Sequence, residues 1–296
     1  MNGKFGPIWA GTDFSKDAGL AVRRAARLSL ELGAPLHLLH ALDEGDWLAR
    51  AARLTHGHFT HELLLRAAGS QLARLRDQLA ADGVTDVETH VSADSLHKAV
   101  HEIVAEGACA LFVMGARGEG SFREGLLGST ADRVLRSGSV PVLLCRRDAS
   151  PWQRVVLATD FSATSEQAAR LGLAISPEAS HYLLHANELV LDRGLAFANT
   201  SPEAREAYHR EAWENAGRQL TALTQTLGPE AQRITRAPRQ GRPAQVLASF
   251  VEETAADLVV LGARPRARWE HNLLGSTAHF AANKLACDVL VVPGKP

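Results

Sequence analysis

The chain has 296 residues, which suggests about two domains, and its 32 basic and 33 acidic side chains give a formal net charge of −1. Charges also balance within each half, so no strong basic field exists to attract a polyanion and we expect no nucleic-acid partner. The three cysteines occur singly along the chain. The sequence has no apolar stretch of bilayer length and no secretory signal. We therefore expect a cytoplasmic protein with no membrane partner.

In chain order, short apolar runs alternate with helical patterns in both halves. The expected strands are 8–11, 36–41, 84–91, 110–114 and 140–145, then 155–159, 182–186, 232–237, 258–261 and 289–292. In the first half, helices are expected over 21–32, 64–79, 95–106 and 129–137, the first three ended by Gly33, Gly83 and Gly107. Strand runs such as 111–114 do not alternate in polarity, which is typical of strands covered on both faces.

The sequence also repeats itself at a constant offset. In the first half the repeated pieces are Thr12-Asp13-Phe14-Ser15, Gly115 and Gly128-Ser129-Thr130, and in the second half they are Thr159-Asp160-Phe161-Ser162, Gly262 and Gly275-Ser276-Thr277. A fixed long period indicates two copies of one domain, which we place at 1–148 and 151–296. The strand–helix alternation makes each copy an α/β, doubly wound domain with a five-stranded parallel sheet and helices on both faces.

A glycine-rich segment follows the fourth expected strand of the first copy. It reads Gly115-x2-Gly118-x9-Gly128-Ser129-Thr130 and ends where the fourth helix begins. Glycine lets a phosphate approach backbone amides, and a helix N-terminus offers free N–H groups to an anion. Ser129 and Thr130 add hydroxyl donors, and Arg117 adds positive charge. The segment therefore predicts a phosphate-binding loop.

Two further positions lie at carboxyl ends of strands, where the ligand crevice of a doubly wound sheet opens. Asp13 follows the first strand and suits ribose hydroxyls or a divalent ion, and Ala41 ends the second strand with backbone groups for an adenine edge. His40 and its counterpart His185 are expected to be hydrogen-bonded residues beside the crevice.

These motifs resemble those of the universal stress protein family, and the resemblance covers essentially the whole chain as two copies. It implies the strand order 3-2-1-4-5 in each domain, ATP binding by members that carry the loop, and docking of tandem halves. Carried over by position, the ATP pocket would be lined by Asp13, Ala41, Gly115, Arg117, Gly118, Gly128, Ser129 and Thr130.

The second copy departs from the motif, because Pro265 stands where the first copy has Gly118. Proline removes an N–H donor and fixes φ. We therefore expect a second site that is weaker or that binds another ligand. Its candidate residues are Asp160, Gly262, Arg264, Gly275, Ser276 and Thr277.

The leading hypothesis is a stress-response protein that binds ATP, with or without Mg²⁺, in its N-terminal domain, so that nucleotide occupancy acts as a signal. We expect no catalytic residues; a nucleotide-independent scaffold for an unidentified protein partner and a weak ATPase remain the alternatives. The fifth strands, 140–145 and 289–292, are expected to pair into an intramolecular pseudo-dimer. Further assembly into a homodimer is left open.

Histidine groups raise the question of a metal. His97 and His101 lie one helical turn apart, and His56, His58 and His61 cluster near a helix start. Neither group has a third ligand at a firm spacing, so we expect solvated faces and no metal site.

Overall fold

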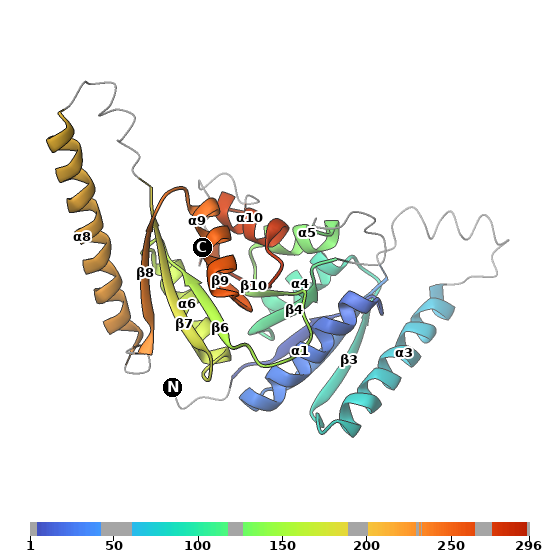
Figure 1. Ribbon diagram of the computed structural model, residues 1–296. Coiled ribbons are helices and arrows are strands. Elements are labelled where there is room, and N and C mark those ends of the chain that lie inside the picture. Colours follow the sequence, from blue (N-terminus) through green and yellow to red (C-terminus); the bar gives the residue numbers. More distant parts are fainter. Residues whose placement is uncertain are drawn as a thin grey trace. The chain divides into compact units, whose positions relative to one another are not determined.

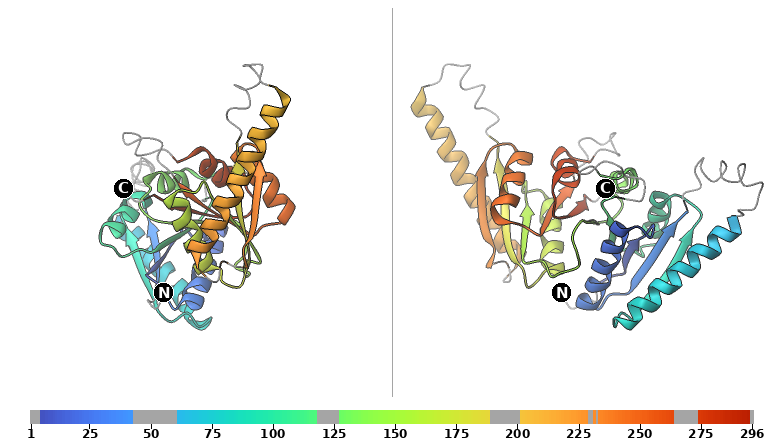
Figure 2. Two further views of the ribbon diagram at one scale, coloured as in Figure 1. Left: turned by 90° about the vertical axis from the view of Figure 1, so that its left-hand side faces the viewer. Right: turned by 45° about the vertical axis from the view of Figure 1, so that its right-hand side comes forward.

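The computed structural model describes residues 5–42, 61–117, 127–188, 201–228, 231, 233–263 and 274–294. The chain divides after Ser150 into two compact units, here named the N-terminal and C-terminal domains. Each domain has a central sheet between two layers of helices (Figures 1 and 2). Among the described helices, none combines the length and the apolar character needed to cross a membrane.

The N-terminal domain has a parallel sheet in the order β3-β2-β1-β4-β5. Its strands are β1 (Ile8–Gly11), β2 (Leu36–Ala41), β3 (Val87–Ser92), β4 (Leu111–Gly115) and β5 (Val142–Cys145). One face is covered by α1 (Lys16–Leu32) and α3 (His61–Ala81), and the other by α4 (Leu96–Ala105) and α5 (Ser129–Ser137). The expected fold and the strand order 3-2-1-4-5 are confirmed.

The C-terminal domain repeats this topology in the order β8-β7-β6-β9-β10. Its strands are β6 (Arg154–Ala158), β7 (Ser180–Asn187), β8 (Thr235–Gln240), β9 (Leu258–Ala263) and β10 (Asp288–Pro293). The helices α6 (Ala163–Ile175) and α8 (Pro202–Leu227) cover one face, and α9 (Pro243–Thr254) and α10 (Ser276–Lys284) cover the other.

Among the strands, the third of each domain differs most from our expectation. We expected 84–91 and 232–237, but β3 begins at Val87 and β8 at Thr235. Val84 instead belongs to the turn that follows α3: its side chain is buried, and its amide donates to the Leu79 carbonyl at 2.9 Å. Both strands lie at the outer end of their sheet, where polar residues and even Pro238 are tolerated.

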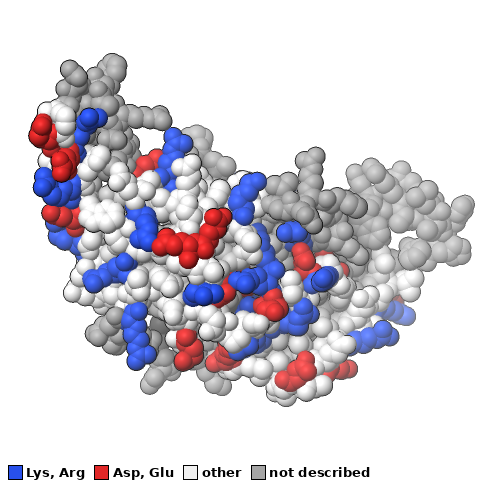
Figure 3. All heavy atoms as spheres, viewed as in Figure 1, with Lys and Arg blue, Asp and Glu red and all other residues white. Residues whose placement is uncertain are grey.

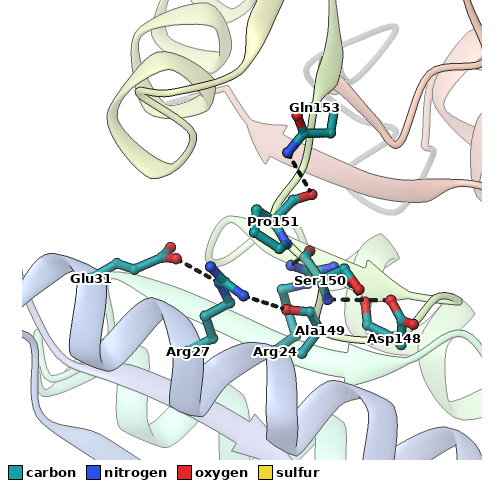
Figure 4. A network of polar contacts seen from close by, with 8 residues as sticks. All are labelled: Arg24, Arg27, Glu31, Asp148, Ala149, Ser150, Pro151 and Gln153. Carbon is teal, nitrogen blue, oxygen red and sulfur yellow. Dashed lines mark hydrogen bonds and ion pairs between the residues drawn. The ribbon is translucent and has the colours of Figure 1, made fainter.

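The junction between the domains is held on its N-terminal side by two arginines of α1 (Figure 4). The Arg24 guanidinium, only 2 % exposed, donates to the Ser150 carbonyl at 2.7 Å and to the Asp148 carbonyl at 2.6 Å. Arg27 donates to the Ala149 carbonyl at 3.2 Å. A buried guanidinium requires such partners, because an unpaired buried charge is very costly. Residues 148–150 are therefore part of the N-terminal domain.

On the C-terminal side of the junction, residues 152–154 are hydrogen-bonded to the C-terminal domain. The buried Trp152 indole Nε1–H donates to Asp288 Oδ2 at 2.9 Å. Asp257 Oδ2 accepts from the amides of Gln153 and Arg154 at 2.8 and 2.9 Å. Each end of the junction thus belongs to its own domain.

Surface charges of both signs are interspersed over the described residues on the face shown in Figure 3. Several of them form pairs one helical turn apart, such as Arg27–Glu31 and Arg170–Glu166. Exposed pairs of this kind add little stability, about 0.3–0.5 kcal/mol each.

His181, in β7, gives the stability a predictable dependence on pH. Its ring Nε2 lies 3.1 Å from Ser176 Oγ, which itself donates to the Gly172 carbonyl at 2.6 Å, so the imidazole is the donor to the serine. Burial lowers the pKa of His181 below its ordinary 6.5. The unfolded chain therefore binds more protons at acid pH, and the free energy of unfolding should fall as pH drops below about 6.5.

We expect urea unfolding at about pH 5.5 to show a lower midpoint than at pH 7.5. Part of that difference should be absent from His181→Gln, which does not titrate. An identical loss of stability in the variant would contradict this assignment.

Candidate functional site

The repeated Thr-Asp-Phe-Ser segment forms the same turn in both domains. In the N-terminal domain Thr12 Oγ1 accepts from the Phe14 amide and Asp13 Oδ1 accepts from the Ser15 amide, both at 3.0 Å. Ser15 then caps α1, since its side chain accepts from the Ala18 amide. The turn places Asp13 at the carboxyl end of β1, as the sequence predicts.

The C-terminal copy is built alike. Thr159 Oγ1 accepts from the Phe161 amide at 2.9 Å, and Asp160 Oδ1 accepts from the Ser162 amide at 3.0 Å. Phe14 and Phe161 both have a φ of 62°. Left-handed backbone is unfavourable for a bulky side chain and persists only where the surroundings enforce it. We assigned no role to the phenylalanines; their repetition in both copies was the signal.

A histidine supports each of these turns from the neighbouring strand. His40 Nδ1–H donates to the Thr12 carbonyl at 2.8 Å, and His185 Nδ1–H donates to the Thr159 carbonyl at 2.9 Å. The His40 ring lies 4.7 Å from the Phe14 ring, and the His185 ring 4.3 Å from the Phe161 ring. The expectation that both histidines are hydrogen-bonded is confirmed.

The glycine at the end of the fourth strand lets backbone segments approach closely. A Cβ at Gly115 would lie 3.0 Å from both the Asp17 carbonyl carbon and the Arg117 oxygen, and one at Gly262 would lie 2.9 Å from Thr164 Cγ2. Asp17 and Thr164 belong to the first turns of α1 and α6, and Arg117 follows Gly115 by two residues. Both glycines therefore have a packing reason to be there, besides the phosphate contact that we expected.

The N-termini of α5 and α10 are capped differently from those of α1 and α6. Gly128 and Gly275 are their N-caps, and neither helix has a side-chain cap hydrogen bond. Ser129 and Ser276, the first helical residues, are exposed. The first N–H groups of a helix lack intrahelical partners, so a glycine cap, which brings no side-chain acceptor, leaves the amides of the first turn to water or to an anion.

In the N-terminal domain, the candidate residues lie at one end of the sheet. Asp13, Ala41 and Gly115 end or follow β1, β2 and β4, and Arg117 comes two residues after Gly115. The Gly128 amide donates to the Ala116 carbonyl at 2.9 Å, so the two ends of the glycine-rich segment meet before α5 begins. Thr130 follows Ser129 in the first turn and is exposed. Gly118 lies outside the described residues.

In the C-terminal domain, the same end of the sheet contains a cavity of about 330 Å³. Five of the residues predicted for the second site line it together: Asp160, Gly262, Gly275, Ser276 and Thr277. Apolar walls come from Leu184, Leu247 and Leu261, and His185 completes the rim. An apolar cavity with a few convergent polar groups is the usual form of a small-molecule site. Arg264 and Pro265 lie outside the described residues.

The domain model described as "Universal stress protein family" matches residues 4–146 and again 151–293. The chain belongs to the universal stress protein family. A curated universal stress protein of Mycolicibacterium smegmatis is 26 % identical over an alignment of 296 positions, which covers 96 % of this chain and 96 % of that protein. The sequence resemblance and the tandem organisation are thereby confirmed.

Solved structures share the fold over both domains. A universal stress protein from Archaeoglobus fulgidus has a TM-score of 0.69 and 18 % identity, over 97 % of this chain and 96 % of that one. A protein from Pseudomonas aeruginosa described as functionally unknown has a TM-score of 0.66 and 21 % identity, over 97 % and 92 % of the two chains. At these identities, the likeness to the solved structures shows the fold of this universal stress protein.

Proposed function

We propose that the N-terminal domain of this universal stress protein binds ATP and that its occupancy regulates an interaction with a protein partner in the cytoplasm. The start of α5 carries the proposal: a glycine cap without a capping side chain, followed by the exposed Ser129 and Thr130. The helix dipole and the first-turn amides favour an anion at this position.

The other candidate residues take complementary roles. The triphosphate lies against the first turn of α5, with Arg117 balancing its charge. Asp13 accepts from a ribose hydroxyl or helps to hold a Mg²⁺ ion bound to the phosphates, because hard cations prefer carboxylate oxygens. The backbone of Ala41 meets the adenine edge. Asp13 Oδ1 already accepts the Ser15 amide, which fixes the direction of the carboxylate.

The C-terminal cavity supports a second, separate ligand site. Asp160 and the start of α10 reproduce the polar groups of the first copy around about 330 Å³ of space. The number of ATP molecules bound per chain tests whether this site binds the same ligand. One ATP per chain would mean that the C-terminal site binds a different ligand, and two would mean that both domains bind ATP.

The pairing of the two fifth strands stays a prediction. Within its own domain, β5 pairs with β4 and β10 pairs with β9. A last strand left open would expose unpaired backbone groups, which is the physical reason for expecting the two to pair.

Exchanging Asp13 for Asn should weaken ATP binding about tenfold, since the lost negative charge no longer serves a ribose hydroxyl or Mg²⁺; hydrogen bonds to charged groups contribute about 1.5–3 kcal/mol. The amide oxygen of Asn still closes the turn to Ser15. Isothermal titration with ATP and Mg²⁺ measures the change.

The control is Asp160→Asn, the same substitution at the matching turn of the other domain, which should leave the N-terminal affinity unchanged. If Asp13→Asn binds ATP as tightly as the wild type, the proposed ATP site is wrong. Protein purified without nucleotide separates the rival interpretations: no released adenine nucleotide and no thermal shift with ATP favour the scaffold. Phosphate release that disappears in Asp13→Ala favours the weak ATPase.

A further inference from the structure

Three metal-ligating side chains meet on one face of the N-terminal sheet, away from the crevice. They are His37 in β2 and Glu88 and His90 in β3. His37 pairs with Glu88 in the parallel register, and His90 is two residues further along β3, so all three point to the same side. We expected no metal site, and the sequence does not single out these three residues. They are far apart in the chain, and only the strand pairing brings them together.

The three ligand atoms are spaced as a metal ion requires. His37 Nδ1 lies 3.0 Å from His90 Nε2 and 3.5 Å from Glu88 Oε2, and His90 Nε2 lies 3.7 Å from the same Glu88 oxygen. Metal–ligand distances of about 2.0–2.2 Å at tetrahedral angles place neighbouring ligand atoms about 3.3 Å apart. A single ion between the three atoms needs only small movements.

Trp9 fixes the two imidazoles from the adjacent strand. Its ring stacks on His37 with centroids 4.5 Å apart and planes 11° apart, and it lies 4.6 Å from the His90 ring. The indole Nε1–H donates to the Ala108 carbonyl at 2.7 Å, so the tryptophan itself is held in place. Ligands with fixed ring orientations lose little freedom when a metal binds.

The C-terminal copy provides an internal comparison. Strand registers equate Trp9, His37, Glu88 and His90 with Val156, Tyr182, Thr235 and Ala237. None of these four residues offers an imidazole or a carboxylate. The two domains share the turns at the crevice, whereas the ligand cluster belongs to the N-terminal copy alone among these matched positions.

We propose that His37, Glu88 and His90 bind a Zn²⁺ ion in the N-terminal domain, with the fourth coordination position turned to solvent. Two imidazoles and one carboxylate, with water in the fourth position, are a ligand set that zinc uses in proteins. The side chains of His37, His90 and Glu88 are 15 %, 37 % and 67 % exposed, so an ion can enter from the glutamate side. Water or an external ligand then completes the coordination.

The protonation states agree with this geometry. Burial lowers the pKa of His37, although the nearby charges of Glu88 and Asp86 act in the opposite direction. Burial and the neighbouring His37 lower the pKa of His90, against the charge of Glu88. Both shifts favour the neutral imidazole, which is the form that binds a metal.

This site is independent of the proposed nucleotide site. His37 lies near the start of β2, and Ala41 at its carboxyl end is about 13 Å further along the strand. Zinc binding therefore neither requires ATP nor depends on the N-terminus of α5.

The test uses the full chain, freed of metal with a chelator and without nucleotide. Titration with ZnCl₂ should show one saturable ion per chain, and Co²⁺ should give the visible absorption of four-coordinate cobalt. Glu88→Gln should weaken zinc binding at least about tenfold and His90→Ala at least about 100-fold, since even indirect supports of a metal site contribute 10–100-fold. Glu88 is largely exposed, so its variant keeps the fold and should show a smaller zinc-dependent rise in Tm than the wild type.

The control is the double variant His97→Ala/His101→Ala, which removes the histidine pair of α4 and should bind zinc as the wild type does. ATP affinity of Glu88→Gln should equal that of the wild type. The proposal is overturned if the wild type shows no saturable 1:1 zinc binding, or if Glu88→Gln and His90→Ala both bind zinc with unchanged affinity.

Discussion

Ser129→Glu should lower ATP affinity about 100-fold and at the same time make the N-terminal domain slightly more stable. Ser129 is exposed and is the first residue of α5, whose cap Gly128 brings no side chain of its own. A carboxylate there interacts favourably with the helix dipole by about 0.3–1 kcal/mol. The same carboxylate repels a triphosphate; two unit charges about 5 Å apart cost roughly 3 kcal/mol near a protein surface.

The opposite signs of the two effects make this variant informative. Isothermal titration gives the affinity, and thermal unfolding without nucleotide shows that lost binding does not come from a damaged fold. Ser276→Glu is the matched substitution at the start of α10 and should leave the N-terminal affinity unchanged. If Ser129→Glu binds ATP as tightly as the wild type, the nucleotide does not use the start of α5.

Most of the fold follows from local sequence patterns. Non-alternating apolar runs predict the buried central strands, and the glycines that stop α1, α3 and α4 lie where a positive φ is required: Gly33, Gly83 and Gly107 have φ values of 60°, 92° and 70°. The bounds of β3 and β8, the third strands of the two domains, were predicted less accurately. Thr235–Gln240 contains two arginines and a proline, and only its pairing with β7 makes it a strand.

The site shows the same division between local and non-local information. Asp13 and the glycine-rich segment could be found because their spacing repeats along the chain. The positive φ of Phe14 could not be derived from a residue type that rarely adopts it. The metal-ligand cluster was missed for a different reason, since His37 meets Glu88 and His90 only through the register of two strands that are distant in sequence.

The comparison of the two copies suggests how their roles have separated. The Asp turn, the capping serine and the supporting histidine are common to both copies. The copies differ on another face of the sheet, where β2 and β3 carry His37, Glu88 and His90 and the matching positions of β7 and β8 carry no metal-ligating side chain. On the proposals made here, the N-terminal domain combines nucleotide and zinc binding, and the C-terminal cavity retains a ligand site of its own.

Gly115→Ala should destabilise the N-terminal domain by about 2 kcal/mol, because overpacking a tight contact typically costs 1–3 kcal/mol. The new methyl group would lie 3.0 Å from the Asp17 carbonyl carbon and the Arg117 oxygen, which are backbone atoms without rotamers to move aside. The strain would push the end of β4 from the first turn of α1 and should also weaken ATP binding. Urea unfolding gives the stability, and hydrogen exchange of the β4 amides assigns the loss to this domain.

Gly69→Ala serves as the control, because it makes the same chemical change where nothing lies within 4 Å of the added carbon. Gly69 lies in the interior of α3, where alanine is favoured over glycine by about 1 kcal/mol. The two substitutions should therefore shift the unfolding midpoint in opposite directions. If both substitutions shift the unfolding midpoint equally, a side chain at Gly115 meets no steric conflict. The close approach of β4 to α1 would then not explain why both copies have a glycine at this position.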